Sequence, residues 1–174
     1  THGKTTTSSM LAWILEANGK NPGFLIGGIP ENFGISARST DSEYFVIEAD
    51  EYDCAFFDKR SKFVHYHPQV LVMNNLEYDH ADIFDSIKDI QKQFHHLVRT
   101  VPSKGLIVMP NDDNNLKEVI DMGCWTQTCC VGDSNSLHAK LLKADGSEFE
   151  IYDGDKFIYK VKYACTGTYN VHNS

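Results

Sequence analysis

The chain opens with Thr1-His2-Gly3-Lys4-Thr5-Thr6-Thr7. A glycine followed by Lys-Thr at the start of a helix is typical of a phosphate-binding loop. Gly3 lets the backbone approach a phosphate, Lys4 places a positive charge on the β and γ oxygens, and the Thr5 hydroxyl can ligate Mg²⁺. The stretch therefore predicts nucleotide binding, with an ordinary helix start capped by threonines as the alternative.

A helix is predicted from about Thr5 to Glu16. Apolar residues recur on one face at helical spacing, at Met10, Trp13, Ile14 and Ala17. Asn18-Gly19 supplies a C-terminal stop. The N-terminus of this helix carries unsatisfied N–H groups and the positive end of the helix dipole, so it would point at the phosphates.

Composition excludes several classes of protein. The 174 residues are 41% apolar and 23% charged, which is typical of one globular domain with a sizeable core. A net charge of −8 with no basic run argues against nucleic-acid binding. There is no signal peptide and no apolar run long enough for membrane insertion. Five cysteines without regular spacing indicate reduced thiols and a cytoplasmic protein, and they do not predict a zinc site.

Both ends suggest that the chain is an excerpt of a larger protein. A phosphate loop normally follows a buried strand, and no such strand precedes Thr1. At the other end, Tyr169–Ser174 has the pattern of the first turn of a helix that then stops. We therefore expect further parts of the protein to contribute to its activity.

Strands and helices are predicted to alternate after the first helix. Predicted strands are Gly23–Gly28, Tyr44–Ile47, Val70–Met73, Leu106–Met109 and Thr126–Val131, and predicted helices are Ser86–Val98 and Asn114–Met122. Residues 29–41 have the composition of a loop. This order predicts an α/β fold, with a mostly parallel sheet flanked by helices. Alternating residues and Asp-Gly turns at about 137–163 predict a small antiparallel β excursion near the C-terminus.

Polar clusters follow two of the predicted strands, at Glu48–Asp53 and Asn75–His80. In parallel sheets, ligands bind beyond the carboxyl ends of the strands, so both clusters should lie near the opening loop. Glu48 stands where an acidic Mg²⁺ ligand follows a buried strand. Glu51 and Asp53 are also carboxylates, so the choice within the cluster stays open, and a solvated acidic loop is the alternative.

His80 is the second candidate metal ligand. A neutral imidazole beside a carboxylate is a plausible ligand, and Asp79 is available to orient its ring. A single histidine is, however, more often structural.

Four motifs resemble, in order and spacing, those of the central domain of the Mur ligase family: Gly3–Thr7, Glu48–Asp53, Asn75–His80 and Gly167–Asn173. Within that family, Phe24–Arg38 and the long Glu48–His80 block, which contains Phe56–Tyr66, look like the members that act in cell-wall recycling. Those members join UDP-N-acetylmuramate to the murein tripeptide L-alanyl-γ-D-glutamyl-meso-diaminopimelate.

The resemblance implies an ATP-dependent carboxylate–amine ligase that works through an acyl phosphate. Carried over by position, it implies that the nucleotide is bound by Thr1, His2, Gly3, Lys4, Thr5, Thr6, Asn170 and Asn173. It also implies catalytic roles for Lys4, Glu48 and His80, with Mg²⁺ held by Thr5 and Glu48 and a second Mg²⁺ served by His80. Tyr169 stands where the family motif has histidine.

The resemblance also implies that residues 1–174 are a central ATP-binding domain between N- and C-terminal domains of the same chain. Alone, this domain would be inactive. Two alternatives remain open: the sibling UDP-N-acetylmuramate:L-alanine ligase, and a nucleotide-binding module without activity of its own.

Overall fold

The computed structural model describes residues 2–78 and 84–174. Its helices are α1 (Lys4–Ala17), α2 (Ile87–Val98), α3 (Asn114–Asp121) and α4 (Thr168–His172), with a 3₁₀ turn η1 (Lys62–His65). Its strands are β1 (Gly23–Leu25), β2 (Ala37–Arg38), β3 (Phe45–Ile47), β4 (Asp53–Ala55), β5 (Asp58–Ser61), β6 (Val70–Val72), β7 (Leu106–Pro110), β8 (Gln127–Val131), β9 (Leu137–Leu141), β10 (Glu148–Asp153) and β11 (Lys156–Lys162). The predicted helices and strands are all present, with small differences at their ends.

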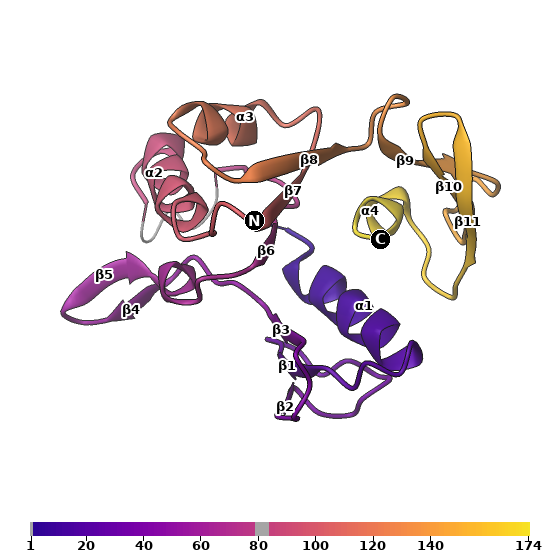
Figure 1. Cartoon of the computed structure of the whole chain (residues 1–174), viewed down its shortest axis with the longest axis horizontal. Helices are drawn as coiled ribbons and strands as arrows, with labels where there is room; N and C mark the ends of the chain where they lie inside the picture. Colours follow the sequence, from indigo (N-terminus) through magenta and orange to yellow (C-terminus); the bar gives the residue numbers. More distant parts are fainter. Residues whose placement is uncertain (1, 79–83) are drawn as a thin grey trace.

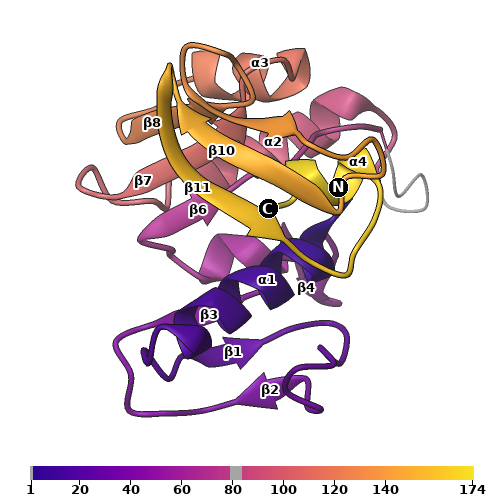
Figure 2. The ribbon, with the colours of Figure 1, turned by 90° about the vertical axis from the view of Figure 1, so that its right-hand side faces the viewer.

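A six-stranded sheet forms the larger part of the fold, in the order β11-β10-β9-β8-β7-β6 (Figure 1). Strands β6 to β9 run parallel, whereas β9, β10 and β11 pair antiparallel. Figure 2 shows the long β10 and β11 strands face on. The predicted α/β fold, with a mostly parallel sheet and an antiparallel excursion near the C-terminus, is confirmed. Strand β9 pairs parallel with β8 and antiparallel with β10, so it joins the parallel and antiparallel parts into one sheet.

A second sheet has the order β2-β1-β3, with β1 parallel to β3 and antiparallel to β2. The predicted loop at residues 29–41 therefore contains a short strand. Within residues 2–78 and 84–174, no ladder joins β3 to β6. The N-terminal end of α1 bridges the two sheets instead, because His2 bonds to Asn75 after β6 and Thr5 bonds to Glu48 after β3.

Helices cover both sides of the parallel strands. α2 and α3 lie on one side of β6–β8, and α1 and α4 lie on the other (Figure 1). The larger core lies under α2 and α3, where Ile107, Leu116 and Val119 are each 0% exposed. None of the helices in the described part of the chain has both the length and the apolar character to cross a bilayer.

The face of α1 that packs on the small sheet is not the predicted one. Ala12 is fully buried in a cluster with Phe24 and Val46, whereas Trp13 and Ile14 are 42% and 52% exposed. Apolar residues occur around most of this helix, so their spacing could not identify the buried side. The short Ala12 side chain lets the helix backbone lie close to the strands.

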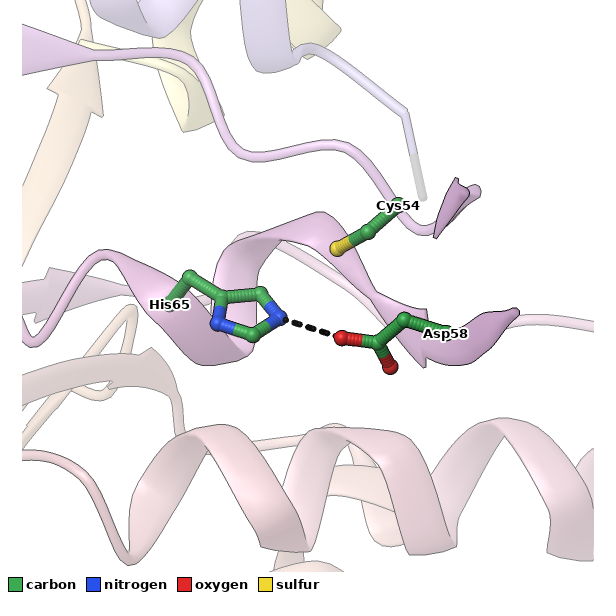
Figure 3. Close-up of side chains that lie close together, drawn as sticks. All are labelled: Cys54, Asp58 and His65. Carbon is green, nitrogen blue, oxygen red and sulfur yellow. Dashed lines mark hydrogen bonds and ion pairs between the residues drawn. The ribbon is translucent and has the colours of Figure 1, made fainter. Parts of the chain in front are cut away.

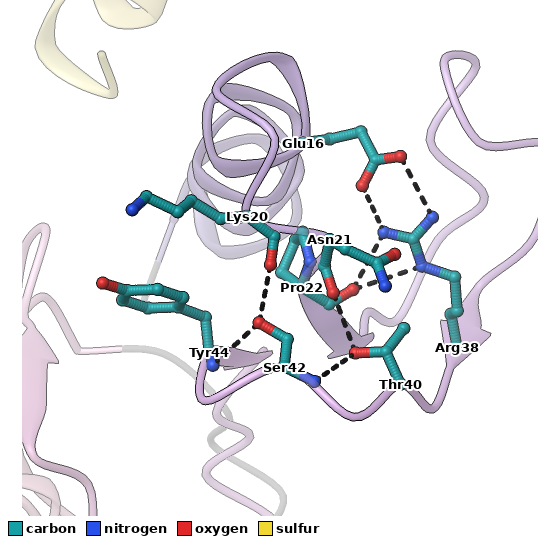
Figure 4. Close-up of polar contacts among 8 residues, drawn as sticks. All are labelled: Glu16, Lys20, Asn21, Pro22, Arg38, Thr40, Ser42 and Tyr44. Carbon is teal, nitrogen blue, oxygen red and sulfur yellow. Dashed lines mark hydrogen bonds and ion pairs between the residues drawn. The ribbon is translucent and has the colours of Figure 1, made fainter.

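Polar contacts around Arg38 fix the turn between α1 and β1 (Figure 4). Arg38 Nη2 donates to Glu16 Oε2 at 2.5 Å and to the Pro22 carbonyl at 2.9 Å. The hydrogen bond from Arg38 holds the pKa of the Glu16 carboxyl below its usual value. Two hydroxyls add bonds to the backbone of the turn, from Thr40 to Asn21 and from Ser42 to Lys20.

Strands β4 and β5 form a hairpin that projects from the body of the molecule and was not predicted (Figure 1). An ion pair between Lys59 and Asp53, with 2.7 Å between nitrogen and oxygen, links its strands. The following turn η1 is anchored to α2, because Phe63 packs edge-on against Phe94 with 5.5 Å between ring centres.

Candidate functional site

The N-terminus of α1 has the geometry of an anion site. Gly3 precedes the helix with φ +79°, a left-handed conformation that favours glycine. No side chain of the described residues caps the first turn of α1, so its backbone N–H groups are available to a ligand. An open depression of about 320 Å³ lies there, lined by His2, Gly3, Lys4, Thr5, Thr6 and Glu48.

Glu48 reaches this helix N-terminus from the end of β3. Its Oε1 accepts a hydrogen bond from Thr5 Oγ1 at 2.9 Å, and its Oε2 accepts one from the Gly27 N–H at 2.8 Å. Both carboxylate oxygens are thereby oriented by neighbouring backbone and side chain. A threonine hydroxyl beside a carboxylate is a donor set that suits Mg²⁺. The structure thus brings Thr5 and Glu48 together, and their metal role stays a prediction.

Lys4 points to a different carboxylate of the same acidic cluster. Its Nζ forms an ion pair with Oε2 of Glu51, whose side chain is only 2% exposed. The sequence left the roles of Glu48 and Glu51 open, and the structure separates them: Glu48 faces the Thr5 hydroxyl and Glu51 faces the Lys4 ammonium. Glu51 therefore fixes the position of the positive charge at the helix N-terminus.

Asn74 and Asn75 hold the opening loop from the β6 side. Asn75 Oδ1 accepts from the His2 N–H at 2.8 Å, and Asn75 Nδ2 donates to the His2 carbonyl at 3.1 Å. Asn74 Nδ2 donates to Thr7 Oγ1 at 2.7 Å. Sequence reasoning gave Asn74 no role. The available signal was its place directly after a parallel strand, where ligand sites are built.

Of the two predicted nucleotide-binding asparagines, only Asn173 reaches the opening loop. Its Oδ1 accepts from Asn74 Nδ2 at 3.2 Å, and its side chain packs directly against Gly3. Asn170 Nδ2 instead donates to the Thr166 carbonyl at 2.8 Å, just before its own helix α4. Tyr169 is 67% exposed. The predicted nucleotide contacts of Asn170 and Asn173 remain predictions.

His80 and Thr1 lie outside the described residues, so their predicted roles also remain predictions. The segment that leads towards His80 is well fixed. The Leu76 N–H donates to Asp113 Oδ2 at 2.8 Å, and the Leu76 carbonyl accepts from Asn115 Nδ2 at 2.7 Å. Because Asp113 also caps α3, the start of that helix sets the path of this segment.

Comparison with known sequences agrees with the family resemblance of the four motifs. The family description "Mur ligase middle domain" matches residues 1–174. The UDP-N-acetylmuramate–L-alanyl-gamma-D-glutamyl-meso-2,6-diaminoheptandioate ligase of Escherichia coli (strain K12) is 59% identical over 174 residues, which are 99% of this chain and 38% of that protein. The UDP-N-acetylmuramate–L-alanine ligase of Dictyoglomus turgidum is 33% identical, over 99% of this chain and 36% of that protein. The chain thus spans less than half of the curated relatives it matches.

Solved structures show the same fold. The UDP-N-acetylmuramate:L-alanyl-gamma-D-glutamyl-meso-diaminopimelate ligase from Neisseria meningitides matches with a TM-score of 0.93 and 54% identity, over 99% of this chain and 56% of that one. A UDP-N-acetylmuramate–alanine ligase from Thermotoga maritima matches with a TM-score of 0.75 at 22% identity, over 99% of this chain and 37% of that one. The second likeness shows the fold alone.

Proposed function

The chain belongs to the Mur ligase family and corresponds to its middle domain, and from this premise we propose that the full-length protein is an ATP-dependent ligase. It joins UDP-N-acetylmuramate to L-alanyl-γ-D-glutamyl-meso-diaminopimelate in peptidoglycan recycling. Support comes from the 59% identity to a relative that bears this activity in its name, against 33% for a relative named as the L-alanine ligase.

In this proposal, residues 1–174 are the central ATP-binding domain, with a β-rich excursion at about 137–163. Flanking N- and C-terminal domains supply the sites for the UDP-sugar and the peptide. We place the protein in the cytoplasm, where ATP is available and where its five cysteines, all free thiols in the structure, stay reduced.

The contact between Thr5 and Glu48 is the observation that carries the proposal. A hydroxyl and a carboxylate from residues 43 positions apart meet at 2.9 Å beside a helix N-terminus. These residues would hold Mg²⁺, with His80 serving a second ion. Bound Mg²⁺ neutralises phosphate charge and stabilises the negative charge that develops during phosphoryl transfer.

Lys4 acts on the triphosphate. In the structure its ammonium pairs with buried Glu51, which holds the side chain at the first turn of α1. When ATP binds, Lys4 donates to the β and γ oxygens, and the N–H groups of the α1 first turn bind the same phosphates. Between turnovers, when no ATP is bound, the ion pair with Glu51 holds the Lys4 side chain in place.

The reaction needs no nucleophile from the protein. A substrate carboxylate attacks the γ-phosphorus of ATP, and ADP leaves. The amine of the second substrate attacks the resulting acyl phosphate, and the tetrahedral intermediate expels inorganic phosphate. Lys4 and the helix N-terminus offset the repulsion between carboxylate and triphosphate in the first step.

The test is phosphate release by the full-length protein with ATP, Mg²⁺ and UDP-N-acetylmuramate. Release that depends on the tripeptide supports the proposal, release with L-alanine reassigns the protein to the sibling ligase, and no release with either favours a module without activity. Lys4→Ala should abolish turnover without unfolding the protein, whereas Lys20→Ala, three residues beyond the C-terminal end of α1, should leave turnover unchanged. Activity of Lys4→Ala within about tenfold of wild type, worth only about 1.4 kcal/mol, would exclude the phosphate role.

A further inference from the structure

Outside the nucleotide site, the described residues contain one group of side chains with the donor set of a metal centre. Cys54 of β4, Asp58 of β5 and His65 of η1 point towards one another (Figure 3). Their ligand atoms all lie within 4.8 Å of one another. His65 Nε2 and Asp58 Oδ2 are 3.2 Å apart. None of the three belongs to the set proposed for Mg²⁺.

The spacing of these atoms suits a small tetrahedral ion. Zinc bonds of about 2.0–2.3 Å imply separations of roughly 3.3–3.8 Å between neighbouring ligand atoms. The separation of His65 Nε2 and Asp58 Oδ2 is already close to this range. The Cys54 sulfur lies within 4.8 Å of the other two ligand atoms, so it needs to approach them by at most about 1.5 Å to complete the set.

The donors also select the ion. A thiolate is a poor ligand for Mg²⁺ and Ca²⁺, which prefer oxygen, whereas Zn²⁺ accepts sulfur, imidazole nitrogen and carboxylate oxygen in one site. We propose that Cys54, Asp58 and His65 form a Zn²⁺ site, with water in the fourth position. Cysteine spacing could not predict it, because its three donors come from three residue types.

Arg60 is the competing group. It donates to Asp58 through Nε at 2.9 Å and through Nη2 at 2.8 Å. The bond from Nε and the backbone bond from Arg60 N fall on Oδ1, whereas Zn²⁺ would use Oδ2, the oxygen that faces His65. The Arg60 side chain is 58% exposed, so its Nη2 can turn to solvent while Nε continues to orient the carboxylate.

A bound ion would fasten the β4–β5 hairpin. This hairpin pairs with no other strand in the described part of the chain, and its register is irregular between Asp53 and Ala55. Two-stranded ribbons of this kind are marginally stable alone. One ion held by β4, β5 and η1 would connect the hairpin to α2 through Phe63 and Phe94.

The test uses the reduced, metal-free, full-length protein and needs no enzymatic activity. Co²⁺ is titrated as a coloured substitute, and Zn²⁺ is then added to displace it. We expect a thiolate charge-transfer band that corresponds to one thiolate-bound Co²⁺ per chain. Cys54→Ser should abolish the band, and His65→Gln should weaken Zn²⁺ binding by roughly tenfold or more. Cys165→Ser, which removes an exposed thiol elsewhere, is the matched control and should change neither.

Absence of the band, its persistence in Cys54→Ser, or its loss in Cys165→Ser would overturn the site. Unchanged Zn²⁺ affinity in His65→Gln would do the same. As a second readout, Zn²⁺ should slow amide hydrogen exchange at residues 53–61 in the wild type and not in Cys54→Ser. The proposal does not rest on the ligase function, because Co²⁺ and Zn²⁺ binding are measured without ATP or either ligase substrate.

Discussion

Replacing Gly3 by alanine tests the junction between the opening loop and α4. Gly3 has φ +79°, and an alanine in this left-handed region costs about 1–2 kcal/mol. The added Cβ would also lie 2.9 Å from Asn173 Cγ and 3.0 Å from Asn173 Nδ2, closer than such contacts normally occur. Overpacking of this kind costs about 1–3 kcal/mol. Gly3→Ala should therefore destabilise the full-length protein by about 2–5 kcal/mol.

Gly19 provides the matched control. Its φ is +70°, but a Cβ added there would meet no atom within 4 Å. Gly19→Ala should therefore show the backbone cost alone, about 1–2 kcal/mol. The two free energies of unfolding are measured by urea denaturation, and their difference isolates the contact with Asn173.

A double-mutant cycle completes the test. Asn173→Ala removes the amide that crowds the new Cβ, so Gly3→Ala should cost about 1–3 kcal/mol less in that background than in the wild type. Equal costs in the two backgrounds, together with equal effects of Gly3→Ala and Gly19→Ala, would refute the reasoning. In that case α4 would not pack against the opening loop, and Asn173 would lose its structural link to the phosphate site.

Three further outcomes are expected in the full-length protein. Glu48→Gln should raise the Mg²⁺ concentration needed for phosphate release, and an unchanged Mg²⁺ titration would remove Glu48 from the metal site. Glu51→Gln should lower the free energy of unfolding by about 1–3 kcal/mol, because the buried partner of Lys4 loses its charge; urea denaturation at neutral pH with no change would contradict that pairing. Arg38 holds the folded-state pKa of Glu16 below the ordinary 4.5, so its stabilisation is present above about pH 4.5 and is lost as pH falls through the lowered folded-state pKa. The melting temperature of Glu16→Gln should therefore be lower than wild type at pH 7 and converge with it in acid, and a gap independent of pH would show that Glu16 acts through packing.

The parallel strands could be predicted because their signal is local. Val70–Met73 and Leu106–Pro110 are continuous apolar runs, each followed by an asparagine, and such runs are typical of strands in a parallel sheet. The β4–β5 hairpin gives no such signal. Its second strand, Asp58–Ser61, is mostly charged, and an ion pair between Lys59 and Asp53 links it to β4. An interaction of that kind becomes visible only when the two strands are placed side by side.

The packing of α1 shows a second limit. A helix that is apolar on most sides can bury any of them, and the choice is made by the partner surface. Here the partner surface, built around Phe24 and Val46, receives Ala12, and it leaves Trp13 and Ile14 half exposed. Residue spacing within α1 contains no information about that surface.

The candidate site likewise has one part that the sequence predicts and one part that it does not. The meeting of Thr5 with Glu48 followed from the rule that polar residues after parallel strands gather at one edge. Asn173 reaches the opening loop and Asn170 does not, because the end of α4 lies against Gly3. That contact is long-range, and no local sequence pattern predicts it.

The pairing of Lys4 with Glu51 adds a constraint on how an acidic protein binds a polyanion. Among the described residues at the helix N-terminus, the Lys4 ammonium pairs with the Glu51 carboxylate, and the Glu48 carboxylate beside Thr5 adds a second negative charge, so the charge of these three side chains is negative before any ligand arrives. The N–H groups and the helix dipole, equivalent to about half a positive charge, do not reverse that sign. A free triphosphate would therefore be repelled at short range, whereas Mg²⁺ is attracted and then presents positive charge to the phosphates. In the proposed function, this distribution of charges would make Mg²⁺ part of the binding step as well as of the chemistry.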